Sequence, residues 1–419
     1  MERKSRYCPW LLGAALGLAL LMPACVHAVG PRRMENLGRG VVAVRKSSKE
    51  VFISWRLLGL DPAGIQFNLY RSANGAEPVK LNGTPLSDGC NDTDSTANLA
   101  QPNAYHVRPV IGGVEQAASA AYTLAANATV EQLIRIPLKA PHDRKVHHCW
   151  VGDFDGDGEY EFVVSLTGTT RGQSQKIAAY KRDGTFLWEV DFGPTSVDPS
   201  NLYPGAATIA AGQWDGVTVY DLDSDGRAEV IVKSANGVKF GDGKTLEYGD
   251  NVTQFISILD GMTGAERTRT VLPNPWKEKN NRALATLLGI GYPDGTRPSL
   301  FIHAKSRVGG AGTPFNLIQS AWDFRDGKLS QRWSIQWDGA DPKNVTNSHQ
   351  MRILDVNGDG RDDLVPGMHV VSSDGKLLYD LGEQGIVHGD RFHISDLDPT
   401  RPGLEGYGIQ QNNPSGLVE

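Results

Sequence analysis

The sequence predicts an all-β protein in which a small β-sandwich of the fibronectin type III kind precedes a β-propeller. Three observations lead to this fold class. The composition is rich in turn-forming residues, with 48 Gly and 23 Pro in 419 residues. Short runs of alternating apolar and polar residues fill the first part of the mature chain. Acidic loops, each followed by a β-rich run, then recur along the remainder.

The N-terminal segment 1–28 has the pattern of a cleavable signal peptide. Basic residues precede the apolar run "LLGAALGLALLMPA", and "VHA" supplies small residues up to the cleavage point after Ala28. We therefore expect a secreted or periplasmic protein, with a lipid anchor at Cys25 as the less favoured alternative. The apolar run is short for a membrane span and no second run follows, so no membrane span is predicted.

The overall composition argues against a nucleic-acid partner. The net charge is −6, with 21% charged and 40% hydrophobic residues. A nucleic-acid-binding face would need a surplus of basic residues, which this chain does not have. Cys90 and Cys149 remain after the signal peptide, and two unpaired thiols are favoured over a disulfide between them.

Residues 34–125 are predicted to form the sandwich. The segments "VFISWRLLG", "IQFNLYRS", "AYHVRPVIGG" and "SAAYTLAA" read as strands, and polar turns separate them. The segment "ATVEQLIRIPLKAP" then connects the sandwich to the propeller, which is assigned to residues 135–419.

The propeller is predicted from five related segments. They are "GDFDGDGEYEFVV", "YDLDSDGRAEVIV", "LDVNGDGRDDLVP", "SDLDPTRPGLEGYGI" and the degenerate "GYPDGTRPSLFIH". The runs after them, such as "IAAYKRDGTFLWEV", contain further strands with Gly/Asp turns. One blade per unit explains this strand content, and the spacing of about forty to seventy residues, better than a sandwich or a helical solenoid does.

The acidic loops are predicted to bind Ca²⁺. Acids at alternate positions, a glycine at the sixth position and a further acid soon after direct several hard oxygen atoms to one point. The predicted ligands, loop by loop, are Asp153, Asp155, Asp157 and Glu161; Asp221, Asp223, Asp225 and Glu229; Asp355, Asn357, Asp359 and Asp363; and Asp396 and Asp398, with Glu405 as a further candidate. The alternative is that the loops are metal-free Asx turns between strands. Bound ions here are expected to stabilise the fold rather than to catalyse a reaction.

Several segments together resemble the family 11 polysaccharide lyases, which are secreted rhamnogalacturonan lyases. These segments are "ENLGRGVVAV", "VFISWRLLGLDP", "FNLYR", "WVGDFDGDGEYEFVV", "VYDLDSDGRAEVIVKSANG" and "HGDRFHISDLDPTRPGLE". The resemblance implies a sandwich followed by an eight-bladed, calcium-binding propeller that cleaves the backbone of rhamnogalacturonan I, a pectin, by β-elimination. Four full units and the start of a fifth are present, about four and a half blades. We therefore expect an incomplete propeller with little activity alone, and a monomer in its complete form.

The resemblance also suggests where the chemistry takes place. Elimination removes the C5 proton of a galacturonic acid, and a metal or cationic groups must stabilise the negative charge that develops. By resemblance, His349, His388 and Asp390 surround the active-site calcium and the substrate. From the residues alone, a histidine before a strand is more often a satisfied loop residue, and nitrogen is an unusual ligand for Ca²⁺. The chain departs from the family pattern at Gln410 and Gln411, where members tend to have an acid. A non-catalytic calcium-stabilised propeller that binds polysaccharide or a protein partner is the alternative function.

Overall fold

The computed structural model describes residues 30–170, 172–197, 205–209, 216–276, 284–306, 315–339, 346–386 and 388–410. These residues form 26 β-strands and two short 3-10 helices, at Pro194–Ser196 and Gly382–Gln384, so the prediction of an all-β fold is confirmed. The predicted signal peptide with Cys25, and Gln411, lie outside the described residues. Over the described ranges, no helix is long and apolar enough to cross a membrane. Cys90 and Cys149 are both free thiols, as predicted.

The first eight strands form two sheets around one apolar core. The three-stranded sheet contains β1 (Val42–Arg45), β2 (Val51–Ser54) and β5 (Asn91–Asp94). The five-stranded sheet contains β3 (Gln66–Ala73), β4 (Val79–Lys80), β6 (Asn103–Ile111), β7 (Val114–Glu115) and β8 (Tyr122–Leu124). Alternate residues of β2 and β6 point into the core, where Ile53 and Tyr105 are fully buried. The alternating pattern in the sequence therefore corresponds to strands with one buried face.

Strands β9 to β24 form four antiparallel sheets of four consecutive strands each. The first contains β9 (Arg144–Gly152), β10 (Glu161–Gly168), β11 (Lys176–Tyr180) and β12 (Phe186–Asp191). The second contains β13 (Val217–Tyr220), β14 (Glu229–Ala235), β15 (Gln254–Asp260) and β16 (Glu266–Val271). The third contains β17 (Ala285–Gly291), β18 (Ser299–Ser306), β19 (Asn316–Arg325) and β20 (Lys328–Trp337). The fourth contains β21 (Arg352–Leu354), β22 (Asp363–Val365), β23 (His369–Val371) and β24 (Leu377–Asp380), and a pair follows with β25 (Phe392–Ser395) and β26 (Glu405–Gly408).

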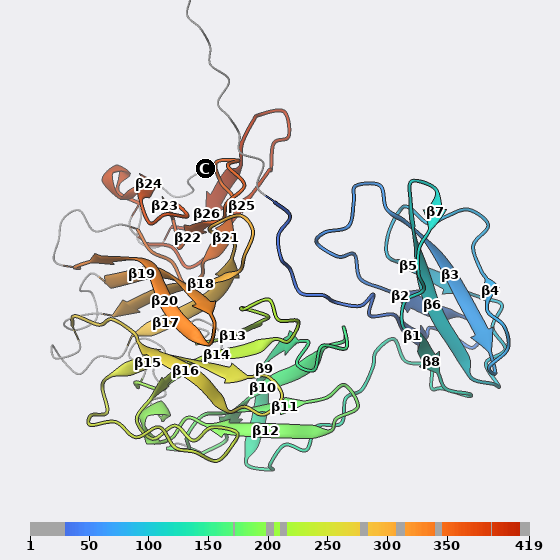
Figure 1. Ribbon diagram of the computed structural model, residues 1–419, viewed down its shortest axis with the longest axis horizontal. Helices are drawn as coiled ribbons and strands as arrows, with labels where there is room; N and C mark the ends of the chain where they lie inside the picture. Colours follow the sequence, from blue (N-terminus) through green and yellow to red (C-terminus); the bar gives the residue numbers. More distant parts are fainter. Residues whose placement is uncertain are drawn as a thin grey trace, which may run out of the picture.

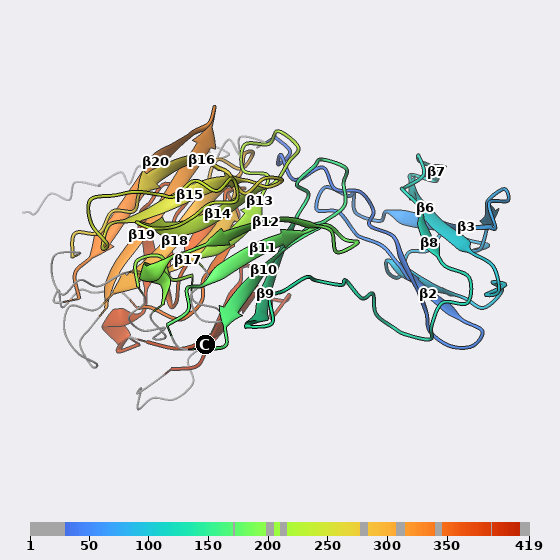
Figure 2. The same ribbon diagram turned by 90° about the horizontal axis from the view of Figure 1, so that it is seen from below.

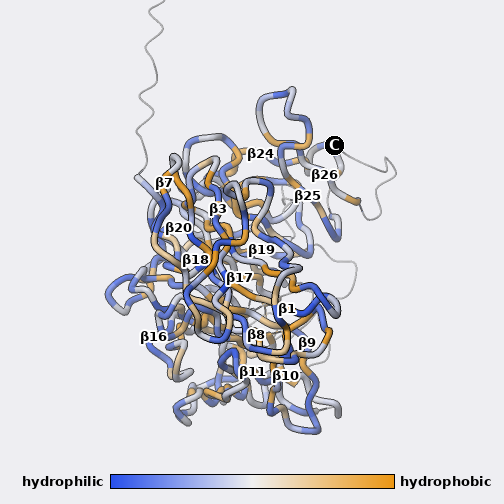
Figure 3. The backbone as a smooth tube through the Cα atoms, turned by 90° about the vertical axis from the view of Figure 1, so that its right-hand side faces the viewer, coloured by the Kyte–Doolittle hydropathy of each residue, from blue (hydrophilic) through white to orange (hydrophobic). Residues whose placement is uncertain are grey.

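The four sheets stand beside one another in chain order (Figure 1). Strand β9 contacts β13, β13 contacts β17, and β17 contacts β21, so the first strands of successive sheets are neighbours. Every residue of β14 and β18 is buried, because neighbouring sheets cover both faces of these strands. One core joins the first and second sheets through Val163 and Val230, and another joins the second and third through Ile231 and Ile302. Figure 3 shows the resulting alternation of apolar and polar stretches along the chain.

The two sheets of β1 to β8 stand apart from the four later sheets, and two connecting segments run between the parts (Figure 2). One is the predicted connector after β8. The other is residues 32–38, which we call the strap.

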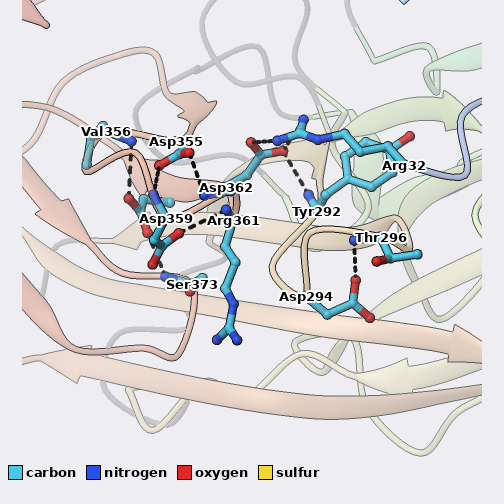
Figure 4. Close-up of polar contacts among 12 residues, drawn as sticks. Arg32, Tyr292, Asp294, Thr296, Asp355, Val356, Asp359, Arg361, Asp362 and Ser373 are labelled. Carbon is cyan, nitrogen blue, oxygen red and sulfur yellow. Dashed lines mark hydrogen bonds and ion pairs between the residues drawn. The ribbon is translucent and has the colours of Figure 1, made fainter. Parts of the chain in front are cut away.

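The strap is held at both ends by polar contacts. Its Arg32 guanidinium forms a bidentate ion pair with Asp362, at 2.7 and 3.0 Å, and the same carboxylate accepts the N–H of Tyr292 at 2.9 Å (Figure 4). At its other end, the N–H of Gly38 donates to Gly158 O at 2.8 Å. The strap therefore ties together loops that belong to the first, third and fourth sheets.

Candidate metal loops and candidate active site

The four predicted metal-binding loops occupy the same place in their sheets. Each joins a first strand to a second strand: β9 to β10, β13 to β14, β21 to β22 and β25 to β26. In every loop the last acid accepts a hydrogen bond, 2.8 to 3.3 Å long, from the N–H of the second loop residue. The pairs are Phe154 and Glu161, Leu222 and Glu229, Val356 and Asp363, and Leu397 and Glu405. The repeat predicted from the sequence is thus also a repeat of backbone geometry.

In the first loop, Asp153, Asp155 and Glu161 each offer one carboxylate oxygen, and the three atoms lie within 4.8 Å of one another. Burial raises the pKa of Asp153, and it raises the pKa of Glu161 to about 7. Lys181, whose Nζ is 2.8 Å from Asp155 Oδ2, lowers the pKa of Asp155. Asp157, also predicted as a ligand, is exposed and lies outside this group.

In the second loop, the converging oxygens belong to Asp221, Asp223 and Asp225. Oδ1 of Asp223 is buried and has no hydrogen-bond partner among the residues that the structure describes. Glu229 lies outside this group and instead contacts the guanidinium of Arg267, which is also 3.0 Å from Asp223 Oδ2. Burial raises the pKa of Glu229 to about 9.

The third and fourth loops differ from the first two in how their acids are arranged. Asp355 organises the third loop by accepting the N–H groups of Gly358 and Gly360 at 2.7 and 2.8 Å. Within the described part of these two loops, no three acids converge within 4.8 Å. Asp396 is exposed, and Asp398 accepts hydrogen bonds from its own turn. The metal-binding roles of Asp355, Asn357, Asp359, Asp363, Asp396 and Asp398 stay predictions.

The first two loops fit a hard divalent cation. Three carboxylate oxygens so close together repel one another unless a cation lies between them. The donors are all oxygens, which is the set that Ca²⁺ takes. The buried Oδ1 of Asp223, which has no partner among the described residues, is the clearest sign of the fit, because leaving a buried carboxylate oxygen without a partner is costly.

The second loop carries a strained residue that permits a test of the shared geometry. Ser224 stands where the first and third loops have Gly156 and Gly358, and all three have left-handed backbones, with φ of 62°, 81° and 75°. Side chains are disfavoured there, so Ser224→Gly is expected to raise the free energy of unfolding by about 1 kcal/mol. Gly358→Ser is the control, because no atom lies within 4 Å of its added Cβ and only the backbone effect remains. It should lower stability by a similar amount in urea unfolding; a destabilising Ser224→Gly would contradict this explanation.

The pKa of Glu161 predicts how the stability of metal-free protein depends on pH. The folded-state pKa of about 7 lies above the ordinary value of 4.5, so the folded state binds the proton more tightly. That stabilisation is present below pH 4.5 and is lost as the pH rises through 7. Calcium requires the deprotonated carboxylate. The difference in melting temperature between calcium-loaded and chelated protein should therefore grow from pH 5 to pH 8, and Glu161→Gln should flatten this trend. A difference that is constant with pH would contradict the prediction.

His349, His388 and Asp390 lie at the opposite ends of the strands from the acidic loops. His349 precedes β21, and the other two precede β25, whereas the acidic loops follow these strands. One ring nitrogen of each histidine and one oxygen of Asp390 lie within 4.8 Å of one another. Asp390 Oδ1 is 3.4 Å from His349 Nε2 and 3.7 Å from His388 Nε2. The structure therefore brings together all three residues that were predicted to surround the site, and the cluster itself could hold a metal ion.

Positive charge surrounds this cluster. Lys305, at the end of β18, is only 2% exposed, and its Nζ is 3.3 Å from Asn347 Oδ1. Arg391 Nη1 donates to His349 O at 3.4 Å. Burial, with Lys305 and His388 adding to it, lowers the pKa of His349 to about 4, so this ring is neutral at neutral pH. A cavity of about 470 Å³ lies beside the cluster, with His349 and Arg391 in its lining together with residues of β17 and β21.

The sequence did not identify Lys305, Asn347 or Arg391 as site residues. Asn347 and Arg391 are close in the chain to predicted residues, which is a usable signal. Lys305 is an isolated cation in the apolar strand "SLFIHAKS", and nothing local links it to His388, from which more than eighty positions separate it.

Comparison with known proteins gives consistent results across the chain. A family model described as "Rhamnogalacturonan lyase family 11, C-terminal domain" matches residues 139–417, and the "Rhamnogalacturonan I lyases beta-sheet domain" matches residues 32–124. Two curated relatives come from Bacillus subtilis. The rhamnogalacturonan endolyase YesW is 34% identical over 91% of this chain, and the rhamnogalacturonan exolyase YesX is 32% identical over 92%. The chain spans 62% and 64% of their lengths, respectively.

Solved structures agree with these matches. The crystal structure of the exotype rhamnogalacturonan lyase YesX aligns with a TM-score of 0.73 and 29% identity, covering 92% of this chain and 65% of that one. The Bacillus licheniformis rhamnogalacturonan lyase PL11 aligns with a TM-score of 0.73 and 32% identity, covering 92% and 67%. The chain therefore belongs to rhamnogalacturonan lyase family 11.

Proposed function

We propose that the protein is a secreted rhamnogalacturonan lyase that cleaves the backbone of rhamnogalacturonan I by calcium-assisted β-elimination. The observation that carries the proposal is the convergence of His349, His388 and Asp390, with Lys305 and Arg391 beside them. The relatives' activities, an endolyase and an exolyase, support the same chemistry. The signal-peptide pattern of the first residues supports secretion.

The proposed architecture is a β-sandwich followed by a β-propeller. The two sheets of β1 to β8 share one core, as the sheets of a sandwich do. Each of the four four-stranded sheets corresponds to one blade, because its strands are consecutive and its first strand lies beside the first strand of the next sheet. In this architecture the acidic loops lie on one face of the propeller and the histidine cluster on the other.

The proposed cations are Ca²⁺ in the acidic loops and Ca²⁺ at the histidine cluster. In the first two loops, the converging carboxylate oxygens would hold the ion, whose charge would remove the repulsion between them. At the cluster, Asp390 would supply oxygen and the two histidines nitrogen. A cation bound there would supply positive charge beside the substrate carboxylate and make the C5 proton more acidic.

The chain's own residues provide the remaining requirements of the elimination. A base takes the C5 proton, the bond from C4 to the leaving oxygen breaks, and a double bond forms between C4 and C5. His349 is neutral at neutral pH because burial lowers its pKa to about 4, so its ring is able to accept a proton or bind a cation. Lys305 and Arg391 add positive charge that favours an anionic sugar in the adjoining cavity.

The test is to incubate purified protein that has a complete propeller with rhamnogalacturonan I and to follow ultraviolet absorbance of the unsaturated uronate. Absorbance that rises with calcium, and does not rise in protein with His388→Ala, would support the proposal. Binding of the polysaccharide without any new absorbance would overturn it and identify the protein as a non-catalytic binder. Reducing ends that form without absorbance would instead identify a hydrolase.

A further inference from the structure

We propose that Asn347 and Lys305 are positioning residues that hold His388 as the tautomer protonated on Nδ1, so that Nε2 presents its lone pair towards Asp390. The proposal concerns hydrogen bonds around His388 that are present without substrate or metal. Only its consequence for catalysis rests on the proposed function.

Lys305 fixes the orientation of the Asn347 amide. Its ammonium has three donor hydrogens and no acceptor, so the amide atom that faces it must be the oxygen. Nζ lies 3.3 Å from Asn347 Oδ1, and both residues are buried, at 2% and 5% exposure. The ammonium also lies 4.1 Å from the centre of the Phe315 ring, a favourable cation–π contact. This buried arrangement leaves the Asn347 amide one favourable orientation.

Two acceptors of Asn347 then fix the tautomer of His388. Nδ1 lies 3.0 Å from the backbone oxygen of Asn347 and 3.1 Å from its Oδ1. A backbone carbonyl only accepts hydrogen bonds, and the Asn347 amide that Lys305 orients presents a second acceptor, so the two oxygens together favour the hydrogen on Nδ1. The two segments are also joined by a parallel β-bridge between Asn347 and His388, and the N–H of Gly389 donates to Asn347 O at 3.3 Å. The ring is therefore placed by backbone as well as by side chain.

In the neutral form of the ring, this tautomer has its lone pair on Nε2, which faces the carboxylate of Asp390. His388 Nε2 and Asp390 Oδ1 are 3.7 Å apart, and in this tautomer both atoms are hydrogen-bond acceptors. They therefore attract each other only when a cation or a proton lies between them. The His349 ring meets the His388 ring edge-on at a centroid distance of 5.2 Å and brings its own Nε2 to the same carboxylate. Histidine ligands commonly donate their second N–H to a carbonyl oxygen in this way, which aims the ligating nitrogen. The pair Asn347 and Lys305 would thus prepare His388 for a cation before one arrives.

Nuclear magnetic resonance of chelated protein labelled with ¹⁵N-histidine tests the tautomer directly, with His388→Gln used to assign the signal. In wild-type protein we expect a pyrrole-type shift for Nδ1 of His388 and a pyridine-type shift for Nε2. An Nε2–H tautomer in this spectrum overturns the proposal without any further variant, so the test does not depend on whether the variants fold.

The variants test which residues are responsible. In Asn347→Ala and Lys305→Met, the other tautomer should become populated, and the calcium chloride concentration that shifts the His388 signal halfway should rise about 10- to 100-fold. Asn347→Asp keeps an oxygen acceptor and should restore the Nδ1–H tautomer. Lys233→Met is the matched control, because Lys233, in β14 of the second sheet, is also buried and donates to a carbonyl oxygen, Leu284 O.

An unchanged tautomer and midpoint in both Asn347→Ala and Lys305→Met would overturn the proposal, as would the same change in Lys233→Met. The lyase assay is read separately. A chain with the expected tautomer but without unsaturated product would retain this inference and remove the proposed function. An active chain with the Nε2–H tautomer would retain the proposed function and remove this inference.

Discussion

Exhaustive treatment with EDTA is expected to lower the melting temperature of the protein by roughly 10 °C or more. An ion present at a hundred-fold excess over its Kd contributes about 3 kcal/mol to the free energy of unfolding. The first two acidic loops offer two such sites. For domains of 150–250 residues, 1 kcal/mol shifts the melting temperature by about 2–4 °C. The loss should be reversed by calcium chloride, and it should be measured by thermal unfolding at constant ionic strength.

Variants distinguish calcium binding from a general effect of the chelator. Asp223→Ala removes a buried oxygen that has no partner among the described residues, so the calcium-dependent part of the stability should fall markedly. Glu77→Ala is the control, because this carboxylate is exposed and lies in none of the acidic loops, so its removal should alter the calcium response little. A melting curve that does not move after exhaustive chelation would remove the claim that calcium stabilises the fold.

The loops were predictable because their geometry is local. The pattern ends in an acid, and in all four loops this last acid accepts a hydrogen bond from the N–H of the second loop residue, only a few positions away. What the sequence could not show is which acid meets a cationic side chain from another strand. Glu229 was predicted as a ligand, but Arg267, from β16, contacts it. Lys181, from the turn after β11, likewise contacts Asp155.

Other parts of the fold depend on contacts between distant segments, and these parts could not be predicted from the sequence. Strand β5, Asn91–Asp94, reads "NDTD", which has no apolar alternation, and it exists because it pairs with the buried strand β2. The contacts of the strap could likewise not be predicted, because Arg32 pairs with Asp362, which is more than three hundred positions away in the chain. The histidine cluster was located only through the family resemblance, since no local pattern links His349 to His388.

In a complete propeller, replacement of His388 by alanine is expected to reduce formation of unsaturated uronate by about a thousand-fold, with the melting temperature changed by only a few degrees. Loss of a group that positions a cation or moves a proton costs about 10² to 10⁴ in rate. The side chain of His388 is 17% exposed at the edge of a pair of rings, so its removal opens no large cavity in the core. Stability should therefore change much less than activity.

The control for this substitution is His106→Ala, which removes a histidine of β6 that stacks on Tyr70 in the first part of the chain. Its effect on product formation should be within the error of the assay. Asp223→Ala provides the opposite case. It changes a loop that is expected to stabilise the fold, so it should lower stability more than it lowers the rate per folded molecule. The rates should be divided by the folded fraction, measured by circular dichroism at the assay temperature. If His388→Ala then keeps the wild-type rate per folded molecule, as Asp223→Ala is expected to do, His388 has no place in the chemistry, and the geometry of its cluster is structural.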